Sequence, residues 1–202
     1  MEQTQLRDVK GDSASELLML EEEAKRCLRC RLHEARHSVV FGEGNADAPL
    51  VAFVGEGPGA DEDRMGRPFV GRAGKLLTAA ITSGMGLRRE DVYIANVVKC
   101  RPPNNRAPLE DEAKTCVESY LFKQLELISP RVIVTLGAPA QLALGGIAGG
   151  ISSIRGKWLN WRGVPLMPTY HPAYILRQPS AKRPFWEDLQ EVMRFLGLSV
   201  TV

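Results

Sequence analysis

The 202 residues are 44% hydrophobic and 25% charged, which suits a single domain with its own core and excludes a disordered chain. No run approaches eighteen apolar residues, so the sequence predicts no membrane contact through a spanning helix. The net charge of +2 favours no partner by itself, but residues 1–63 carry 7 Lys/Arg against 14 Asp/Glu, and residues 64–202 carry 19 against 10. The basic larger part is compatible with a polyanion, although a solvated surface would give the same count.

The N-terminal part contains no basic stretch followed by an apolar one, so we expect no signal peptide and a cytoplasmic location. Residues 1–12 are polar and aperiodic, and we predict a flexible tail there, followed by one domain over residues 13–202. Ser13 or Ser15 could cap the first helix, which runs through "ELLMLEEEAKRC".

Strand and helix patterns then alternate along the chain. Short apolar runs predict strands over residues 49–55, 91–98, 130–137 and 164–172, and "KWLNWRG" (157–163) predicts part of a hairpin leading into the last of them. Amphipathic patterns predict helices over residues 70–83, 109–128, 138–144 and 183–198. The alternation predicts an α/β fold, a three-layer α/β/α sandwich around a four-stranded parallel sheet.

In such sheets ligands bind at the carboxyl ends of the strands. Three segments follow strands there: "GEGPGADEDRMGRPF", "NVVKCRPPNNR" and "YHPAYILRQP". The glycine turn lacks the lysine of a phosphate-binding P-loop, and its carboxylates suit the orientation of water better than phosphate. Phe69 could stack on a base, Asn96 could pair with a base edge, and His171 could act in catalysis. Phe69 and Asn96 could equally be structural residues, and a single histidine such as His171 is more often structural than catalytic, but together the three converge on one sheet edge.

The four cysteines, Cys27, Cys30, Cys100 and Cys116, have the spacing C-x2-C-x69-C-x15-C. Disulfides are unfavourable in a reducing cytoplasm, and four thiolates suit either zinc or a [4Fe–4S] cluster. Zinc sites commonly use two short knuckles, so the long separation favours iron–sulfur slightly. Scattered buried thiols are the remaining alternative.

These motifs together resemble the family 4 uracil-DNA glycosylases, the iron–sulfur enzymes of bacteria and archaea. The resemblance rests on "GEGPG…GRPFVGRAG", "NVVKCRPPNNR", "HPAYILR" and the four cysteines, and it runs from about Glu16 to Leu196. It implies a three-layer α/β/α fold, a structural [4Fe–4S] cluster on the four cysteines, and hydrolysis of the bond between uracil and deoxyribose in single- or double-stranded DNA.

The resemblance also implies roles for single residues. Phe69 would stack on a flipped uracil and Asn96 would read its edge, while Glu62 would form the wall that excludes the methyl group of thymine. His171 and the backbone N–H near Gly57 would meet the negative charge at uracil O2, and Glu56, aided by Asn105, would orient water or stabilise positive charge. We expect DNA contacts from Arg101, Arg106, Tyr174 and Arg177, with residues 174–176 as a wedge in the minor groove.

Two alternatives remain open at this point. One is a relative that binds uracil-DNA covalently through a histidine in an inserted basic loop, although "RPPNNRAPLEDE" shows neither histidine nor insertion. The other is a nucleic-acid-binding module that carries zinc or a cluster and has no catalytic activity. Nothing in the sequence indicates more than a monomer.

Overall fold

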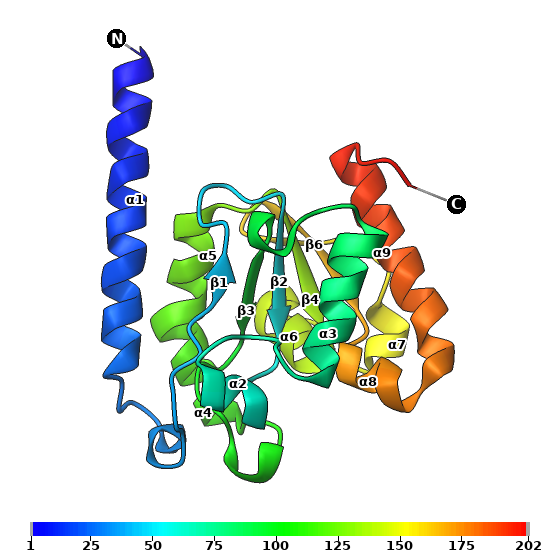
Figure 1. The fold of residues 1–202 in the computed structure, drawn as a ribbon, viewed down its shortest axis with the longest axis horizontal. Helices are drawn as coiled ribbons and strands as arrows, with labels where there is room; N and C mark the ends of the chain where they lie inside the picture. The colour runs from blue at the N-terminus through cyan, green and yellow to red at the C-terminus, as the bar shows by residue number, and fades with distance from the viewer. Residues whose placement is uncertain (1, 201–202) are drawn as a thin grey trace.

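The computed structural model describes residues 2–200, and their side chains from residue 13 onward. Its centre is one six-stranded sheet with the strand order β1–β3–β2–β4–β6–β5 (Figure 1). The strands are β1 (Glu43–Gly44), β2 (Val51–Gly55), β3 (Tyr93–Asn96), β4 (Val132–Leu136), β5 (Leu159–Trp161) and β6 (Val164–Thr169).

The α/β class is confirmed, but the predicted number of strands is too small. The central strands β3, β2, β4 and β6 are parallel, as predicted, and β1 and β5 add an antiparallel strand at each edge. The hairpin of β5 and β6 was expected from the sequence. The two residues of β1 are too few to give a periodic signal, so the sequence could not reveal it.

Nine helices are found in the described part of the chain. They are α1 (Glu2–Lys25), α2 (Ala60–Met65), α3 (Arg72–Ala79), α4 (Glu110–Cys116), α5 (Phe122–Ile128), α6 (Ala138–Gly145), α7 (Ile151–Ile154), α8 (Pro172–Arg177) and α9 (Lys182–Leu196). The predicted helix over 109–128 is continuous, but a wider π-helical turn joins α4 to α5. A similar turn, Ala80–Gly84, extends α3.

The first helix differs from its prediction. It begins at Glu2 rather than at Ser13 or Ser15, so residues 2–12 are helical where the sequence suggested an irregular tail. The separation of a flexible tail from the domain stays a prediction.

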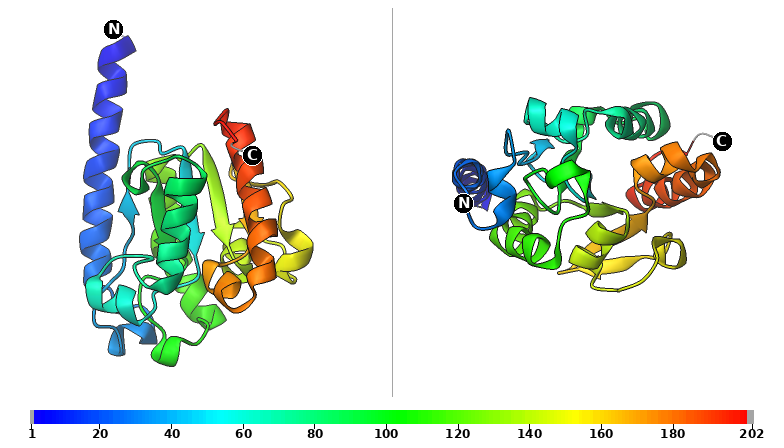
Figure 2. Two further views of the ribbon diagram at one scale, coloured as in Figure 1. Left: turned by 45° about the vertical axis from the view of Figure 1, so that its right-hand side comes forward. Right: turned by 90° about the horizontal axis from the view of Figure 1, so that it is seen from below.

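Alternation along the strands produces two cores, because successive side chains point to opposite faces of a sheet. In β2, Ala52 and Val54 pack under α1, α4, α5 and α6, whereas Val51 and Phe53 pack under α3, α8 and α9. Seen from below, the two helix layers lie on opposite sides of the sheet (Figure 2). The three-layer sandwich is thus built as the sequence predicted.

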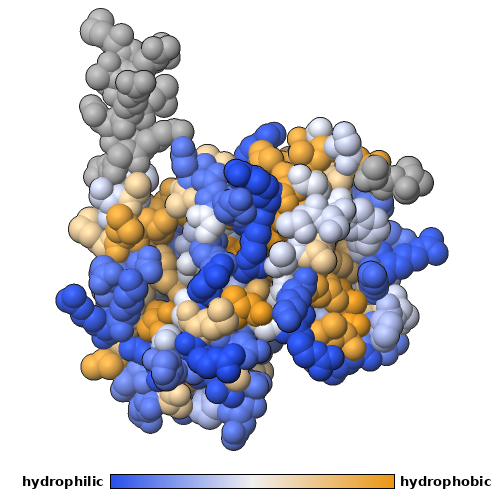
Figure 3. Space-filling view, in the orientation of Figure 1, coloured by the Kyte–Doolittle hydropathy of each residue, from blue (hydrophilic) through white to orange (hydrophobic). Residues whose placement is uncertain are grey.

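The order of the strands fixes where a ligand can bind. From β2 the chain moves to β3 on one side and then to β4 on the other, so the topology reverses next to β2. A crevice at the carboxyl ends of the strands is expected at such a point. In the orientation of Figure 1 these ends point downward, and hydrophilic side chains dominate the surface around them (Figure 3). Among the described residues no helix has the length and apolar character needed to cross a bilayer.

Candidate active site

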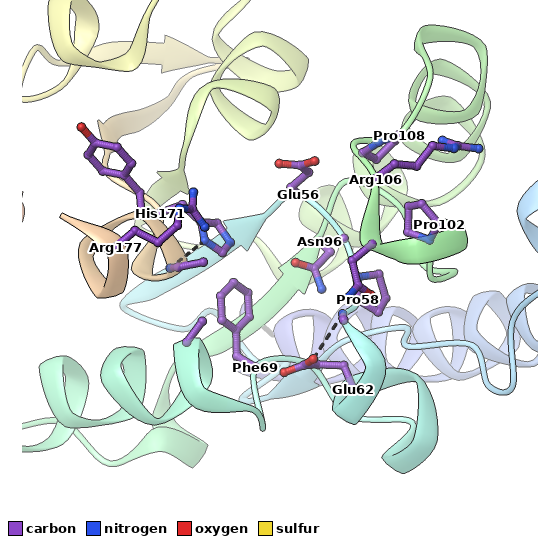
Figure 4. Close-up of a pocket in the computed structure, with 16 residues that line it drawn as sticks. Glu56, Pro58, Glu62, Phe69, Asn96, Pro102, Arg106, Pro108, His171 and Arg177 are labelled. Atoms are coloured by element: carbon purple, nitrogen blue, oxygen red, sulfur yellow. Dashed lines mark hydrogen bonds between the residues drawn. The ribbon is translucent and has the colours of Figure 1, made fainter.

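A cavity of about 510 Å³ lies at this crevice. Its walls come from the loops after β2, β3 and β6, and from the start of α3 (Figure 4). The residues lining it are Glu56, Gly57, Pro58, Gly59, Glu62, Phe69, Ala73, Asn96, Pro102, Asn105, Arg106, Pro108, His171, Ala173, Tyr174 and Arg177. The structure therefore brings together every residue that the sequence suggested for base binding and catalysis.

Asn96 forms the polar floor of the cavity. It is the last residue of β3, pairs in register with Gly55 of β2, and is only 1% exposed. Its Oδ1 atom is buried and has no hydrogen-bond partner among the described residues. A buried acceptor without a partner is costly, and such a group is commonly explained by a ligand or by water. Asn96 thus offers an unused acceptor to whatever fills the cavity.

Phe69 forms the adjoining apolar wall. Its ring is buried, and its centroid lies 5.6 Å from that of the His171 ring. Phe69 has a φ of +50°, in the left-handed region that non-glycine residues rarely adopt. The unusual backbone points the ring across the cavity floor, beside Asn96 (Figure 4).

Gly55 leaves the space that both side chains occupy. A Cβ atom at this position would lie 2.5 Å from Asn96 Oδ1 and 2.5 Å from Phe69 Cζ. We expect Gly55→Ala to displace both groups. The rate of any reaction catalysed in this cavity should then fall about 10²-fold, since small misplacements at a reacting centre have effects of that size. The rate should be measured beside Gly150→Ala, where a Cβ meets nothing within 4 Å. Equal rates for the two variants would contradict the geometry.

His171 faces the cavity from the loop between β6 and α8, where it caps α8. Its Nδ1 accepts a hydrogen bond of 3.0 Å from the backbone N–H of Ala173 (Figure 4). A neutral imidazole that accepts at Nδ1 carries its proton on Nε2. Burial, with a smaller contribution from the Arg177 guanidinium, lowers the pKa of His171 to about 4. At neutral pH the ring is therefore an uncharged Nε2–H donor.

Glu62 connects two walls of the cavity. Its carboxylate accepts hydrogen bonds from the backbone N–H groups of Gly59, Val70 and Gly71, at 3.2, 2.9 and 2.8 Å. It thus ties the glycine turn after β2 to the loop that carries Phe69. The role of Glu62 as the wall that excludes thymine stays a prediction. The hydrogen bonds to the backbone are a second, structural role of the same side chain.

Glu56 and Gly57 follow β2 directly. The carboxylate of Glu56 lies on the side of the cavity opposite Glu62 (Figure 4), and burial raises the pKa of this carboxyl group. Gly57 lies against Val98, so that a Cβ would come within 2.8 Å of that side chain. Glycine at this position therefore lets the turn after β2 pack against the segment after β3.

The predicted residues after β3 lie together but are partly engaged with one another. Asn105 is exposed, and its Oδ1 accepts a 2.7 Å hydrogen bond from Arg101 Nε. Arg106 forms a two-point ion pair with Glu112, whose side chain is 0% exposed. The Arg106 guanidinium thus holds its loop against α4, and a DNA contact by Arg106 stays a prediction.

Tyr174 and Arg177 lie at the mouth of the cavity on α8 and are exposed. The sequence suggested a loop here, but residues 172–177 form a short helix. As a result Ile175 turns into the core and is only 3% exposed, whereas Tyr174 and Leu176 are 38% and 41% exposed. The wedge predicted over residues 174–176 is wrong for Ile175.

The four cysteines lie together away from this cavity. A second, smaller cavity between α1, the loop after β3 and α4 is lined by Cys27, Cys30, Cys100 and Cys116. Arg36 Nη1 lies 3.2 Å from the sulfur of Cys100. The backbone nitrogen of Lys99 lies 3.4 Å from the sulfur of Cys116. Among the described residues no three His, Cys, Asp or Glu side chains converge as a site for one metal ion.

The chemistry of this cavity suits a metal cluster. Burial raises the pKa of Cys30 and Cys100, and that of Cys116 to about 12, so a metal that bound here would have to displace the protons of these thiols. The Tyr120 hydroxyl is buried in the same wall, next to Cys27. N–H and O–H donors around a thiolate set are the environment that cluster sulfurs use.

Sequence reasoning missed the residues that hold these walls in place. Glu112 is one of several acids in "LEDEA", and Arg36 is one of four arginines in "RCLRCRLHEAR", so neither has a distinctive pattern. Arg89, which binds the loop of Phe69, was missed for the same reason. Their roles depend on tertiary contacts that no local pattern encodes.

An open α/β sheet with a buried aromatic ring, an unpaired amide oxygen and a neutral imidazole at its switch point offers the groups that suit a small planar ligand. The family model described as uracil DNA glycosylase superfamily matches residues 41–190. The chain belongs to the uracil DNA glycosylase superfamily.

Individual relatives agree with this assignment. The chain is 48% identical to a type-4 uracil-DNA glycosylase of Thermotoga maritima, over 88% of this chain and 93% of the relative. It is 43% identical to one of Saccharolobus solfataricus, over 89% and 86%. A type-5 uracil-DNA glycosylase of Pyrobaculum aerophilum is 34% identical, over 76% and 72%. The chain is thus more similar to these two type-4 relatives than to this type-5 relative.

Proposed function

We propose that the protein is a uracil-DNA glycosylase, which hydrolyses the N-glycosidic bond of deoxyuridine in DNA, releases uracil and leaves an abasic site. Such a reaction starts the repair of deaminated cytosine. The observation that carries this proposal is the buried, unpaired Oδ1 of Asn96, in a cavity that it shares with the ring of Phe69 and the imidazole of His171. A base inside a duplex cannot reach these groups, so the nucleotide must flip into the cavity.

Asn96 provides the selection for uracil. Its Oδ1 accepts from uracil N3–H and its Nδ2 donates to O4, while the Phe69 ring stacks on the base. Cytosine reverses both polarities, and each mispaired buried group costs about 1–3 kcal/mol. Thymine differs only by the methyl group at C5, and the wall near Glu62 excludes it.

His171 provides the main stabilisation of the leaving base. As the glycosidic bond breaks, negative charge gathers on uracil and much of it lies at O2. The Nε2–H of His171 donates to this oxygen, together with the backbone N–H near Gly57. A preorganised donor of this kind is worth about 3–4 kcal/mol in the transition state.

Glu56 is the carboxylate available to orient water or to stabilise the positive charge on the sugar. The carboxyl oxygens of Glu56 can accept a hydrogen bond from water, and Asn105 lines the same cavity. Arg177 and the exposed Tyr174 and Leu176 contact the DNA around the flipped nucleotide. The enzyme acts as a monomer in the cytoplasm, where its DNA lies.

Cys27, Cys30, Cys100 and Cys116 hold a [4Fe–4S] cluster in this proposal. When bound, the cluster supplies a rigid covalent connection and no redox step, since hydrolysis transfers no electrons. The segment between Cys100 and Cys116 contains Asn105 and Arg106 of the cavity wall. The cysteines at its two ends thus keep that wall in place for DNA.

Replacement of Cys100 by serine should remove the cluster. We expect about four iron atoms per chain in the wild type and far fewer in Cys100→Ser, with loss of the visible absorption band and a lower melting temperature. Iron analysis and the absorption spectrum measure this. Thr115→Ser, in the same cavity wall, is the matched control and should keep the full iron content. Zinc in place of iron in the wild type would contradict the assignment.

The proposal is tested with three oligonucleotides that differ at one position, deoxyuridine, thymidine or deoxycytidine. Alkaline cleavage after incubation should occur at deoxyuridine alone. Cleavage at cytosine would refute the role of Asn96, and cleavage at thymine would refute the wall at C5.

A further inference from the structure

The backbone of Phe69 is held in an unfavourable conformation. A phenylalanine in the left-handed region is strained, and such strain persists only where the surroundings fix it. The carbonyl of Phe69 faces Gly74 of α3, where a Cβ would lie only 1.9 Å from the oxygen. On its C-terminal side, Glu62 binds the N–H groups of Val70 and Gly71.

On the other side of Phe69 the backbone is held by Arg89. Arg89 Nη2 donates to the carbonyl oxygen of Pro68 at 2.7 Å, and Nη1 donates to Thr78 Oγ1 of α3 at 2.7 Å. The guanidinium thus connects the residue before Phe69 to the helix that follows it. It is held in turn by Glu43 of β1, whose Oε1 accepts from Nε at 3.0 Å and from Nη2 at 2.7 Å.

This contact is largely shielded and has a second support. The side chains of Arg89 and Glu43 are 17% and 21% exposed, so the ion pair is less screened than a surface pair. The other oxygen of Glu43 accepts from Arg67 Nε at 2.7 Å. Glu43 therefore binds Arg67, which precedes Pro68 and Phe69 in the sequence, and Arg89, which follows them. Burial alone would raise the pKa of Glu43, but the hydrogen bonds from these two arginines lower it.

Arg89 does not line the base cavity. It lines an open hollow on the far side of Phe69, together with Thr78 and Lys75. Without Arg89, the loop has room on that side to relax away from the cavity.

We propose that Arg89, held by Glu43, is a positioning residue that fixes Phe69 in its strained conformation and so keeps the ring ready to stack on the base. The inference rests on the proposed function, because it assigns Phe69 to base stacking. Arg89 acts through Phe69 and touches neither the base nor the sugar.

The test measures the dissociation constant of free uracil by titration calorimetry. Arg89→Met is expected to raise this constant about tenfold, which corresponds to about 1.4 kcal/mol, and Arg89→Lys by less, because lysine keeps the charge but not the fork of donors. The titration is made well below the melting temperature of each variant, where almost all of the protein is folded, so a general loss of stability leaves the constant unchanged. Arg88→Met is the matched control, because Arg88 pairs with Asp91 and is exposed.

A double variant separates positioning from an independent effect. In a Phe69→Leu background, Arg89→Met should weaken uracil binding no further, since groups that act through one another are not additive. Additive effects, or an unchanged constant in Arg89→Met while the wild type releases uracil, would overturn the inference. A wild type that neither binds nor releases uracil would instead overturn the proposed function, and this inference with it.

Discussion

Uracil release by His171→Ala is expected to be about 10²–10³ times slower than by the wild type. The variant loses the Nε2–H donor at the place where charge develops on O2, an interaction that is stronger in the transition state than in the substrate. The turnover rate should therefore fall more than the affinity for DNA. Single-turnover rates on a deoxyuridine oligonucleotide, with binding measured separately, test this.

The control for this prediction is His37→Ala. His37 is exposed and lies outside the cavity, so its removal should leave the rate unchanged. A near-normal rate in His171→Ala, or a loss confined to DNA binding, would contradict the donor role.

The pH dependence provides an independent check on His171. Because its pKa is about 4, compared with an ordinary value of 6.5, the ring stays neutral throughout the neutral range. The wild-type rate should therefore show no inflection near pH 6.5. Between pH 6.5 and 4 the unfolded chain binds a proton at this residue that the folded chain does not, so the stability contributed here should decline as the pH falls through that window. An inflection of the wild-type rate near pH 6.5 that is absent in His171→Ala would contradict this.

Asn96→Leu is expected to lower kcat/KM for uracil release about 10²-fold or more, since two hydrogen bonds to the base, worth about 1–3 kcal/mol each, are lost. The melting temperature of Asn96→Leu should be equal to that of the wild type or higher. In the free protein Asn96 Oδ1 is buried without a partner among the described residues, so an apolar side chain of similar size removes an unfavourable group.

Thermal unfolding and kinetics, measured on the same preparation, test this pair of effects. Asn160→Ala, at an exposed position of β5 on the sheet edge, is the control for activity. A large drop in melting temperature in Asn96→Leu would mean that Asn96 has a structural partner and that its amide is not held in reserve for a ligand.

The main features of the site were predictable because its chemistry lies at strand ends. The apolar runs before Gly55 and Asn96 place the ends of two neighbouring parallel strands side by side, and the register pairs these residues. The run before His171 brings a third strand end to the same edge. Parallel-sheet geometry alone therefore predicted the convergence.

What the sequence could not predict depends on how side chains pair across the fold. Arg106 forms an ion pair with the buried Glu112, which holds its loop against α4, and the helical turn of α8 buries Ile175. Neither follows from local pattern, because a charge and an apolar residue in a loop look the same whether they face solvent or the protein. The strain at Phe69 is likewise visible only in the backbone.

The most direct test of the central claim is the amount of free uracil released from a single-stranded oligonucleotide with one deoxyuridine, at substrate in large excess over enzyme. We predict that uracil exceeds the enzyme in amount, and that the strand stays intact until alkali cleaves the abasic site. An intact deoxyuridine strand that only shifts in a gel would mean a binding protein. A covalent protein–DNA adduct with no more than one uracil per chain would mean a trapping reaction, and in either case the hydrolytic mechanism would be wrong.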